Sequence, residues 1–413
     1  MESTALITND AVTLGLLAAT LGAIFWTASR PSGFWHRFYT YVPAILPCYL
    51  LPAIYNSVGL IDGAASGLYP MARDYLLPSA LILFCVAMDI GAIARLGPKA
   101  MIMFLVGTFG VMLGAIVSFS VMGAVSPDTV GGETWRGMTT MAGSWIGGGA
   151  NQAAMKEVFE VDATLFGQFV AVDVLVGYFW MAALLLMASR ADSFDRWTGA
   201  DTSAIEDLKQ RIATYQAEHA RIPSMADMMA ILALAIGGTG LAHALAGPLV
   251  AWITSLPAEL RLQDYSLDSG FFWIVIFATT LGVVLSLTRA RSLEGAGASK
   301  VGSVFLYILI ATIGMQMDLR SLADKPMLLL LGLIWISVHA ALMLGVAKLI
   351  RAPLFFMAVG SQANIGGAAS APVVATAFHP ALAPVGVLLA VFGYALGTYC
   401  AYLTGLMLQA MAT

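Results

Sequence analysis

Residues 143–152 read GSWIGGGANQ, and residues 360–368 read GSQANIGGA. Each stretch begins with a Gly-Ser pair and then contains an asparagine and at least two adjacent glycines. Both lie in apolar sequence, where clustered glycines and unpaired amide groups cost free energy. We therefore interpret them as two versions of one motif, and we expect them to meet inside a membrane and form a binding site.

The composition indicates a membrane protein. The chain has 413 residues, of which 59% are hydrophobic and 11% charged, whereas a soluble domain carries about 25% charged residues. This small number of charged residues cannot cover the surface of a chain of this length. We therefore expect an all-α polytopic protein in a lipid bilayer. The net charge of −4 gives no reason to expect nucleic acid. Because no Lys or Arg precedes Arg30, the first segment is interpreted as a retained helix rather than a signal peptide.

Apolar stretches long enough to cross a bilayer recur along the chain. A crossing helix needs about 20 such residues. Ten stretches are predicted as crossings: 5–27, 38–59, 75–94, 100–124, 164–188, 226–250, 270–288, 302–318, 326–350 and 382–410. Two further segments, 137–159 and 353–377, contain the Gly-rich motifs. The length of each allows either one broken crossing or a re-entrant hairpin of two half-helices.

The order of features predicts an internal duplication. Met88-Asp89-Ile90 in the first half matches Met317-Asp318-Leu319 in the second, and each is followed by a long apolar helix, a Gly-Ser motif and a Gly-Tyr pair. We expect a first repeat at 1–188, a cytoplasmic linker at 189–223 and a second repeat at 224–413. Within the linker, Ser203 and Glu206 have capping-box spacing, which predicts a short amphipathic helix.

The distribution of basic residues favours hairpins over full crossings. With five crossings and one hairpin in each half, fourteen of the twenty Lys and Arg residues face the cytoplasm, in agreement with the positive-inside rule. Five is an odd number, so the second repeat is then inverted and the two hairpins enter from opposite sides. Full crossings remain the alternative, which makes the repeats parallel and turns the basic linker outward.

Candidate binding residues come mainly from the motifs. Half-helix N-termini offer free N–H groups to an anion, and unwound carbonyl groups suit Na⁺. Asp173 is the acid predicted to lie deepest in the membrane, and it is assigned to coupling. Asp89 and Asp318 lie near helix ends and are assigned to capping or gating. The predicted substrate- or ion-binding residues are Ser144, Gly147, Gly148, Asn151, Gln152, Asp173, Ser361, Gln362, Asn364, Gly366 and Gly367.

Several other functions lack their sequence signals. No phosphate-binding loop is present, and no His, Cys or Asp cluster has the spacing of a metal site. Ser144 and Ser361 have no histidine nearby in the sequence that could activate them. We therefore expect no enzymatic activity and no cofactor, apart from Na⁺ as a coupling ion.

The motifs also carry a resemblance. Residues 96–100, 143–151 and 361–367 resemble an integral membrane family known as domain of unknown function 819. The layout is more distantly similar to the sodium–glutamate and citrate (2-hydroxycarboxylate) symporters. That likeness implies two inverted domains with re-entrant loops, a homodimer, Na⁺ or H⁺ coupling and elevator-type movement.

These observations together predict a secondary active transporter in a bacterial plasma (inner) membrane. It carries a small polar or anionic solute, coupled to Na⁺ or H⁺, by alternating access around the paired motifs. One alternative is a cation/proton antiporter. Another, from a different class, is a membrane scaffold or sensor that transports nothing.

Overall fold

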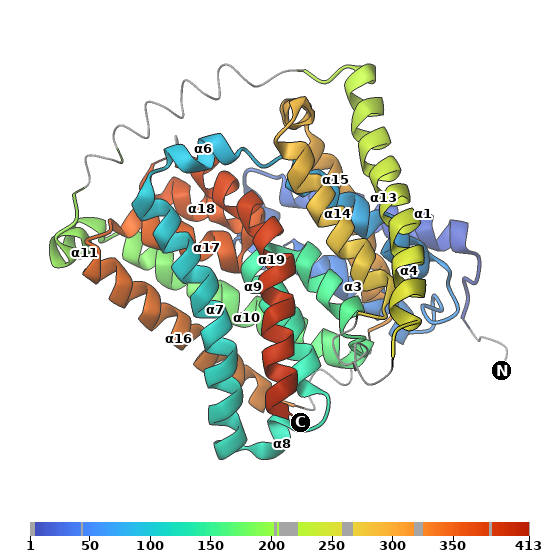
Figure 1. The fold of residues 1–413 in the computed structure, drawn as a ribbon, viewed down its shortest axis with the longest axis horizontal. Helices are drawn as coiled ribbons and strands as arrows, with labels where there is room; N and C mark the ends of the chain where they lie inside the picture. The colour runs from blue at the N-terminus through green and yellow to red at the C-terminus, as the bar shows by residue number, and fades with distance from the viewer. Residues whose placement is uncertain are drawn as a thin grey trace.

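The computed structural model describes residues 5–42, 44–201, 205, 222–257, 267–317, 325–379 and 382–412. These residues form an all-α protein (Figure 1). The first half contains α1 (Asp10–Ala28), α2 (Gly33–Tyr41), α3 (Ile45–Ser57), α4 (Leu68–Met71), the π-helical turn η1 (Ala72–Leu76), α5 (Leu77–Val86), α6 (Ile90–Arg95), α7 (Pro98–Val125), α8 (Pro127–Val130), α9 (Thr134–Val158) and α10 (Ala163–Ala188). After these come α11 (Ala191–Thr198), α13 (Met225–Thr254), α14 (Gly270–Ser286), the 3₁₀ helix η4 (Arg289–Ala296), α15 (Ala298–Gly314), α16 (Met327–Leu349), α17 (Leu354–Ile365), α18 (Gly367–Phe378) and α19 (Ala383–Ala412).

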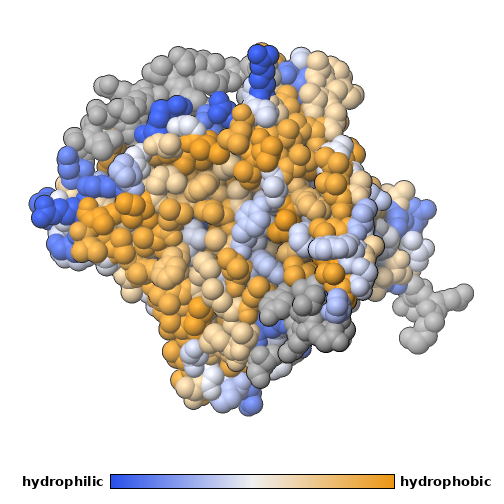
Figure 2. Space-filling model, in the orientation of Figure 1, coloured by the Kyte–Doolittle hydropathy of each residue, from blue (hydrophilic) through white to orange (hydrophobic). Residues whose placement is uncertain are grey.

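The lengths of these helices confirm a polytopic membrane protein. In the described part of the chain, α1, α7, α10, α13, α16 and α19 are long and apolar enough to cross a bilayer, and α14 with η4 forms a seventh, sharply bent candidate. The sequence predicted ten crossings. The difference arises in helices such as α3, which has 13 residues, and α15, which has 17. Figure 2 shows a broad apolar face with hydrophilic residues gathered at its margins.

The helices pack as two bundles. The flanking bundle consists of α1, α3, α5, α13, α14 and α15, and the motif bundle consists of α7, α9, α10, α16, α17, α18 and α19. Each bundle draws helices from both halves of the chain. Contacts of α5 and α14 with α9 and α19 join the two bundles. The Gly-rich motifs both lie in the motif bundle.

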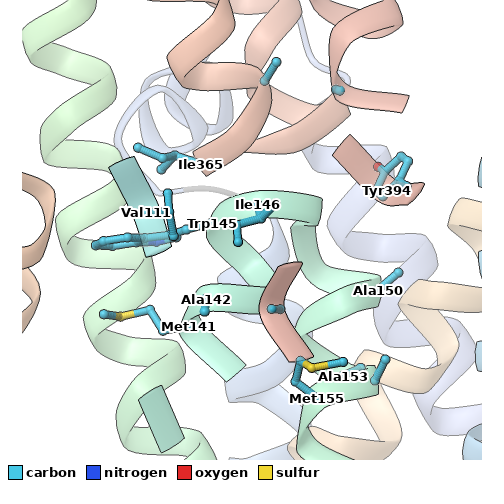
Figure 3. Packing of buried hydrophobic residues seen from close by; sticks show 14 of the residues in the cluster. Val111, Met141, Ala142, Trp145, Ile146, Ala150, Ala153, Met155, Ile365 and Tyr394 are labelled. Carbon is cyan, nitrogen blue, oxygen red and sulfur yellow. The ribbon is translucent and has the colours of Figure 1, made fainter. Parts of the chain in front are cut away.

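The first motif forms a helical hairpin. Gly148 interrupts α9 with φ +71° and ψ −173°, a conformation that L side chains rarely adopt. The two ends of α9 then lie together, because the Arg136 guanidinium donates to the Phe159 carbonyl at 2.6 Å and the Trp135 and Phe159 rings pack edge to face. Buried side chains from both arms, among them Met141 and Met155, join one packed cluster (Figure 3).

The second motif is also a hairpin, and it enters from the opposite end of the bundle. Gly366 separates α17 from α18, and Gly367, the first residue of α18, has φ +57°. The rings of Phe355 and Phe378 at the two hairpin ends lie 5.4 Å apart. The Lys99 ammonium at the start of α7 donates to the Arg351 carbonyl, just before α17. The other end of α7 leads through α8 into α9. Because the 28 residues of α7 span about 42 Å, the bases of the two hairpins lie at opposite ends of the bundle. Entry from opposite sides of the membrane stays a prediction.

Some predictions concern residues outside the described ranges. Asp318 and Leu319, and Ser203, Ala204 and Glu206 of the predicted capping box, all lie there. The described part of the linker forms α11, which packs against α16 and α17. An inverted relation between the two repeats stays a prediction.

Candidate functional site

A cavity of about 580 Å³ lies where the two bundles meet. The flanking bundle contributes residues of α1, α3 and α15, and α2 adds Tyr39. The motif bundle contributes α9, α10, α17 and α18. Its polar lining consists of Tyr39, Tyr49, Ser144, Gln152, Asp173, Tyr178, Tyr307, Gln362 and Ser370, and its apolar lining includes Ile45, Val170, Val174, Met181, Leu185, Ile365 and Val373. Side chains and backbone from both Gly-rich motifs therefore reach one space, as the sequence predicted.

Asp173 on α10 is held at the edge of this cavity by the first hairpin. One carboxylate oxygen accepts from the Ser144 hydroxyl at 2.6 Å and from the Gln152 amide at 3.0 Å. The other accepts from the Trp145 indole N–H at 2.6 Å. All three donors are neutral. Among the described residues that line the cavity, Asp173 is the only one with a carboxylate, ammonium or guanidinium group.

The tips of the two hairpins touch beside the cavity. A Cβ placed on Gly367 would lie 3.6 Å from the Cα of Gly148, so the two backbones are in contact. The hydroxyl of Tyr394, on α19, bonds to the backbone of Ala368 and lies next to both tips. Both helix breaks therefore lie next to each other, and Gly148 and Gly366 line the cavity.

The second hairpin presents an incompletely bonded amide. The Gln362 Nε2 group donates to the Ser370 hydroxyl at 2.7 Å, which links α17 to α18 across the break. The Gln362 Oε1 atom is buried and has no hydrogen-bond partner among the residues that the structure describes. The hydroxyl of Tyr49, on α3, is likewise buried without a partner. Buried polar atoms without partners are rare in native proteins. Gln362 Oε1 and the Tyr49 hydroxyl are therefore available to bond to a ligand or to water.

The structure places the two asparagines in packing contacts beside the cavity. The Asn151 amide donates to the carbonyls of Gly147 and Tyr394, and its oxygen accepts from the Thr398 hydroxyl. Asn364 makes the same set of bonds. Its amide donates to the Gly360 and Phe104 carbonyls and its oxygen accepts from the Thr108 hydroxyl. Neither lines the cavity. Their amides are fully used in fastening each hairpin to a long helix.

Gly147 and Ser361 also act in packing rather than in the cavity lining. A Cβ on Gly147 would lie 2.8 Å from the Gly393 carbonyl oxygen, so glycine is needed for the close approach of α19. The Ser361 hydroxyl accepts from the Trp180 indole and bonds to His339 Nε2, both at 2.8 Å. His339 is buried and its other ring nitrogen bonds to the Gly107 carbonyl, so it is a satisfied core histidine.

Asp89 has a capping role in the structure. Its carboxylate accepts from the Ala92 N–H at the start of α6 and pairs with Arg291 of η4 at 3.1 Å. The residue is buried and lies outside the cavity. In the described ranges no three His, Cys, Asp or Glu residues group as metal ligands.

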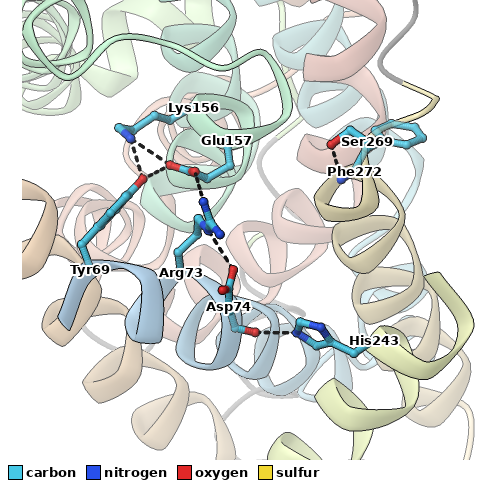
Figure 4. Close-up of polar contacts among 8 residues, drawn as sticks. All are labelled: Tyr69, Arg73, Asp74, Lys156, Glu157, His243, Ser269 and Phe272. Carbon is cyan, nitrogen blue, oxygen red and sulfur yellow. Dashed lines mark hydrogen bonds and ion pairs between the residues drawn. The ribbon is translucent and has the colours of Figure 1, made fainter. Parts of the chain in front are cut away.

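A polar cluster joins the end of the first hairpin to the flanking side (Figure 4). The Lys156 ammonium donates to the Tyr69 hydroxyl and lies 2.8 Å from the Glu157 carboxylate, to which Tyr69 also donates. Arg73 of η1 lies 3.7 Å from Glu157 and pairs with Asp74. These contacts connect α9 with α4 and η1, so any movement between the bundles has to rearrange them.

Sequence reasoning did not assign the cavity tyrosines. Tyr178 belongs to the repeated Gly-Tyr pair, which was a usable signal. Tyr39, Tyr49 and Tyr307 stand in ordinary apolar or aromatic sequence and carry no signal alone. Only the tertiary arrangement of α2, α3 and α15 brings these three tyrosines to the cavity.

The fold and the cavity define an all-α, multi-pass membrane protein with a polar site between two helix bundles. The chain belongs to the family described as "Protein of unknown function (DUF819)", which matches residues 15–411. It is similar to the "Uncharacterized membrane protein YjcL" of Bacillus subtilis (strain 168). The two are 24% identical over 355 residues, which cover 84% of this chain and 85% of that protein.

Proposed function

We propose that this protein is a secondary active transporter of a small polar solute, coupled to Na⁺ or H⁺. The observation that carries the proposal is the cavity of about 580 Å³ between the bundles, lined by both hairpins and by Asp173. Cavities of roughly 300–1,000 Å³ suit small molecules. Discontinuous helices that converge on a polar site are the arrangement by which transporters hold solute and ion.

The position of the cavity suggests how access alternates. Since its walls come from both bundles, a displacement of one bundle against the other would open it to one side and close it to the other. The motif bundle carries both hairpin tips and Asp173, so it would move with the solute, in an elevator-like manner. In this proposal the protein works in a bacterial plasma membrane, as a homodimer.

Asp173 supports the choice of ion coupling. Burying a carboxylate deep in an apolar helix costs free energy, so such a residue indicates a functional site by default. Its three neutral hydrogen-bond donors leave its charge without a basic partner among the described cavity residues. A proton or a bound cation, whether the coupling ion or the solute itself, would neutralise that charge during the crossing of the membrane.

The test uses purified protein in proteoliposomes. We expect Na⁺ or proton gradients to drive uptake of at least one solute from a panel of amino acids, amines and carboxylates, and the Ser144→Ala variant to lose most of that uptake. Ser120→Ala is the matched control, because Ser120 is exposed on α7 and bonds only to the Ile116 carbonyl. Na⁺–H⁺ exchange with no solute uptake would instead support the antiporter. No flux of either kind would contradict transport altogether.

A further inference from the structure

The charge of the cavity restricts the kind of solute. No Lys or Arg is among its described lining residues, and Asp173 supplies a negative charge. Although helix N-termini at the hairpin breaks favour anions, the first break lies beside a carboxylate that is already bonded to Ser144, Trp145 and Gln152. A second anion in the same space would be repelled, and a cation would be attracted.

The unpartnered atoms point in the same direction. Gln362 Oε1 can only accept a hydrogen bond, and it is buried with no donor in the described ranges. In the structure, Ser370 occupies the Nε2 side of this amide, and Oε1 lies on the side without a donor among the described residues. A carboxylate solute could not satisfy Oε1, whereas an ammonium group supplies up to three donors. Asp173 Oδ1 accepts a hydrogen bond from Trp145, and a carboxylate oxygen can accept a second one.

Four tyrosines add a surface that suits a cation. Tyr39, Tyr49, Tyr178 and Tyr307 line the cavity from four different helices. Tyr49 and Tyr178 line the same cavity as the Asp173 carboxylate. Aromatic ring faces attract organic ammonium groups, and clusters of such rings are used to recognise them.

The size and apolar lining favour an organic cation over a bare metal ion. A cavity of about 580 Å³ is far larger than the shell of oxygen ligands that holds Na⁺. Ile45, Val174, Met181 and Leu185 offer surface to a carbon skeleton. Binding of a bare ion would leave that surface unused.

We propose that the solute carries a protonated amine or alkylammonium group, which binds between the Asp173 carboxylate, Gln362 Oε1 and the tyrosine rings. This inference rests on the proposed transport function and replaces the anionic solute that the sequence suggested. The solute itself is defined here only by its chemistry.

The experiment compares cations with anions of similar size. Protein in lipid nanodiscs, at fixed Na⁺ concentration and ionic strength, is titrated with choline, butylamine, butyrate and succinate while thermal unfolding is followed. We expect butylamine, whose ammonium group carries three N–H donors, to raise the Tm in a saturable way. Choline, which has no N–H, should raise it less, and the carboxylates should leave it unchanged. Asp173→Asn should weaken the binding of the cation at least about tenfold, a loss of one charge-assisted interaction.

Two further variants guard against loss of folding. Tyr49→Phe removes a buried hydroxyl that has no partner among the described residues and whose oxygen can accept a hydrogen bond from the ammonium group. This variant should therefore fold normally and bind the cation several-fold more weakly. Ser120→Ala should bind as the parent does. Stabilisation by butyrate or succinate alone would overturn the cation inference while leaving transport intact. Absence of any shift with both amines overturns the inference, and absence of solute-driven flux in proteoliposomes overturns the proposed function separately.

Discussion

The two hairpins share a motif but use it differently. In each, an asparagine bonds to the carbonyl four residues earlier and to a carbonyl and a threonine hydroxyl of a neighbouring long helix. The serines differ. Ser144 donates to the Asp173 carboxylate at the cavity, whereas Ser361 lies in a buried network with Trp180 and His339. The shared residues build a helix break, and the surrounding helices decide what faces the ligand.

The ends of the hairpins differ as well. The first hairpin ends in the cluster of Lys156, Glu157 and Tyr69, which ties it to the flanking side of the protein. The second begins at Leu354, whose N–H donates to Asp195 of α11 at 2.7 Å. Burial raises the pKa of the Asp195 carboxyl, although the hydrogen bond from Leu354 opposes that shift. One hairpin is therefore fastened across the two bundles, and the other to the helix that opens the linker.

The largest expected effect comes from removing the asparagine hydrogen bonds that both hairpins share. Asn151→Ala and Asn364→Ala each delete three buried hydrogen bonds and leave their partners unpaired. Each should lower the free energy of unfolding by about 2–4 kcal/mol, measured by denaturant titration in detergent. Asn56→Ala is the control, since Asn56 accepts one bond from the Gly63 N–H and should cost about 1 kcal/mol. Unequal losses in the two hairpins would break the comparison between them.

The next effect concerns the helix breaks. Gly148→Ala and Gly367→Ala place a Cβ where φ is positive, at a cost of about 1–3 kcal/mol each. Gly148→Ala should cost more, because its Cβ would meet the Tyr394 ring at 3.3 Å. Gly22→Ala, in open space on α1, should not destabilise. Thermal unfolding checks the order, and equal Tm values for Gly148→Ala and Gly22→Ala would show that no strained break exists there.

The serines separate binding from packing. Ser144→Ala should weaken binding of the amine probe about tenfold, because Asp173 loses a hydrogen bond that orients it. Ser361→Ala should leave binding nearly unchanged and lower stability by about 1 kcal/mol. Calorimetric titration and thermal unfolding measure the two quantities on the same samples. A binding loss in Ser361→Ala equal to that in Ser144→Ala contradicts the distinction.

The smallest effect is expected at the end of the first hairpin. Arg73→Gln removes a partly exposed guanidinium 3.7 Å from Glu157 and should change stability by less than about 1 kcal/mol. It should still alter the balance between the two access states, since the cluster joins the bundles. Labelling of an introduced cysteine at the cavity, compared with the same cysteine in an otherwise unchanged chain, measures that balance. Identical labelling rates with and without Arg73→Gln would show that the cluster of Lys156, Glu157, Tyr69 and Arg73 does not influence this balance.

Much of the architecture is predictable from the sequence alone. The apolar composition indicates a membrane protein, because a chain of 413 residues with 11% charged residues cannot cover its surface with polar groups. The glycine clusters mark the two helix breaks, since Gly148 and Gly367 adopt positive φ. The distribution of Lys and Arg predicted hairpins entering from opposite sides. Composition, the backbone freedom of glycine and the positions of charged residues are properties of the sequence itself, so they can be assessed without a tertiary structure.

The assignment of individual side chains depended on the tertiary structure. Asn151 and Gln152 are adjacent in the sequence, yet one fastens α9 to α19 and the other bonds to Asp173. Successive residues on a helix point about 100° apart, so their roles depend on which neighbour lies on each side. The same holds for Ser361 and Gln362. The sequence by itself determined the membrane, the breaks and the opposed hairpins. Only the packing of the two bundles decided which polar groups face the cavity, because that packing brings Tyr49 and Tyr307 from distant helices to Asp173.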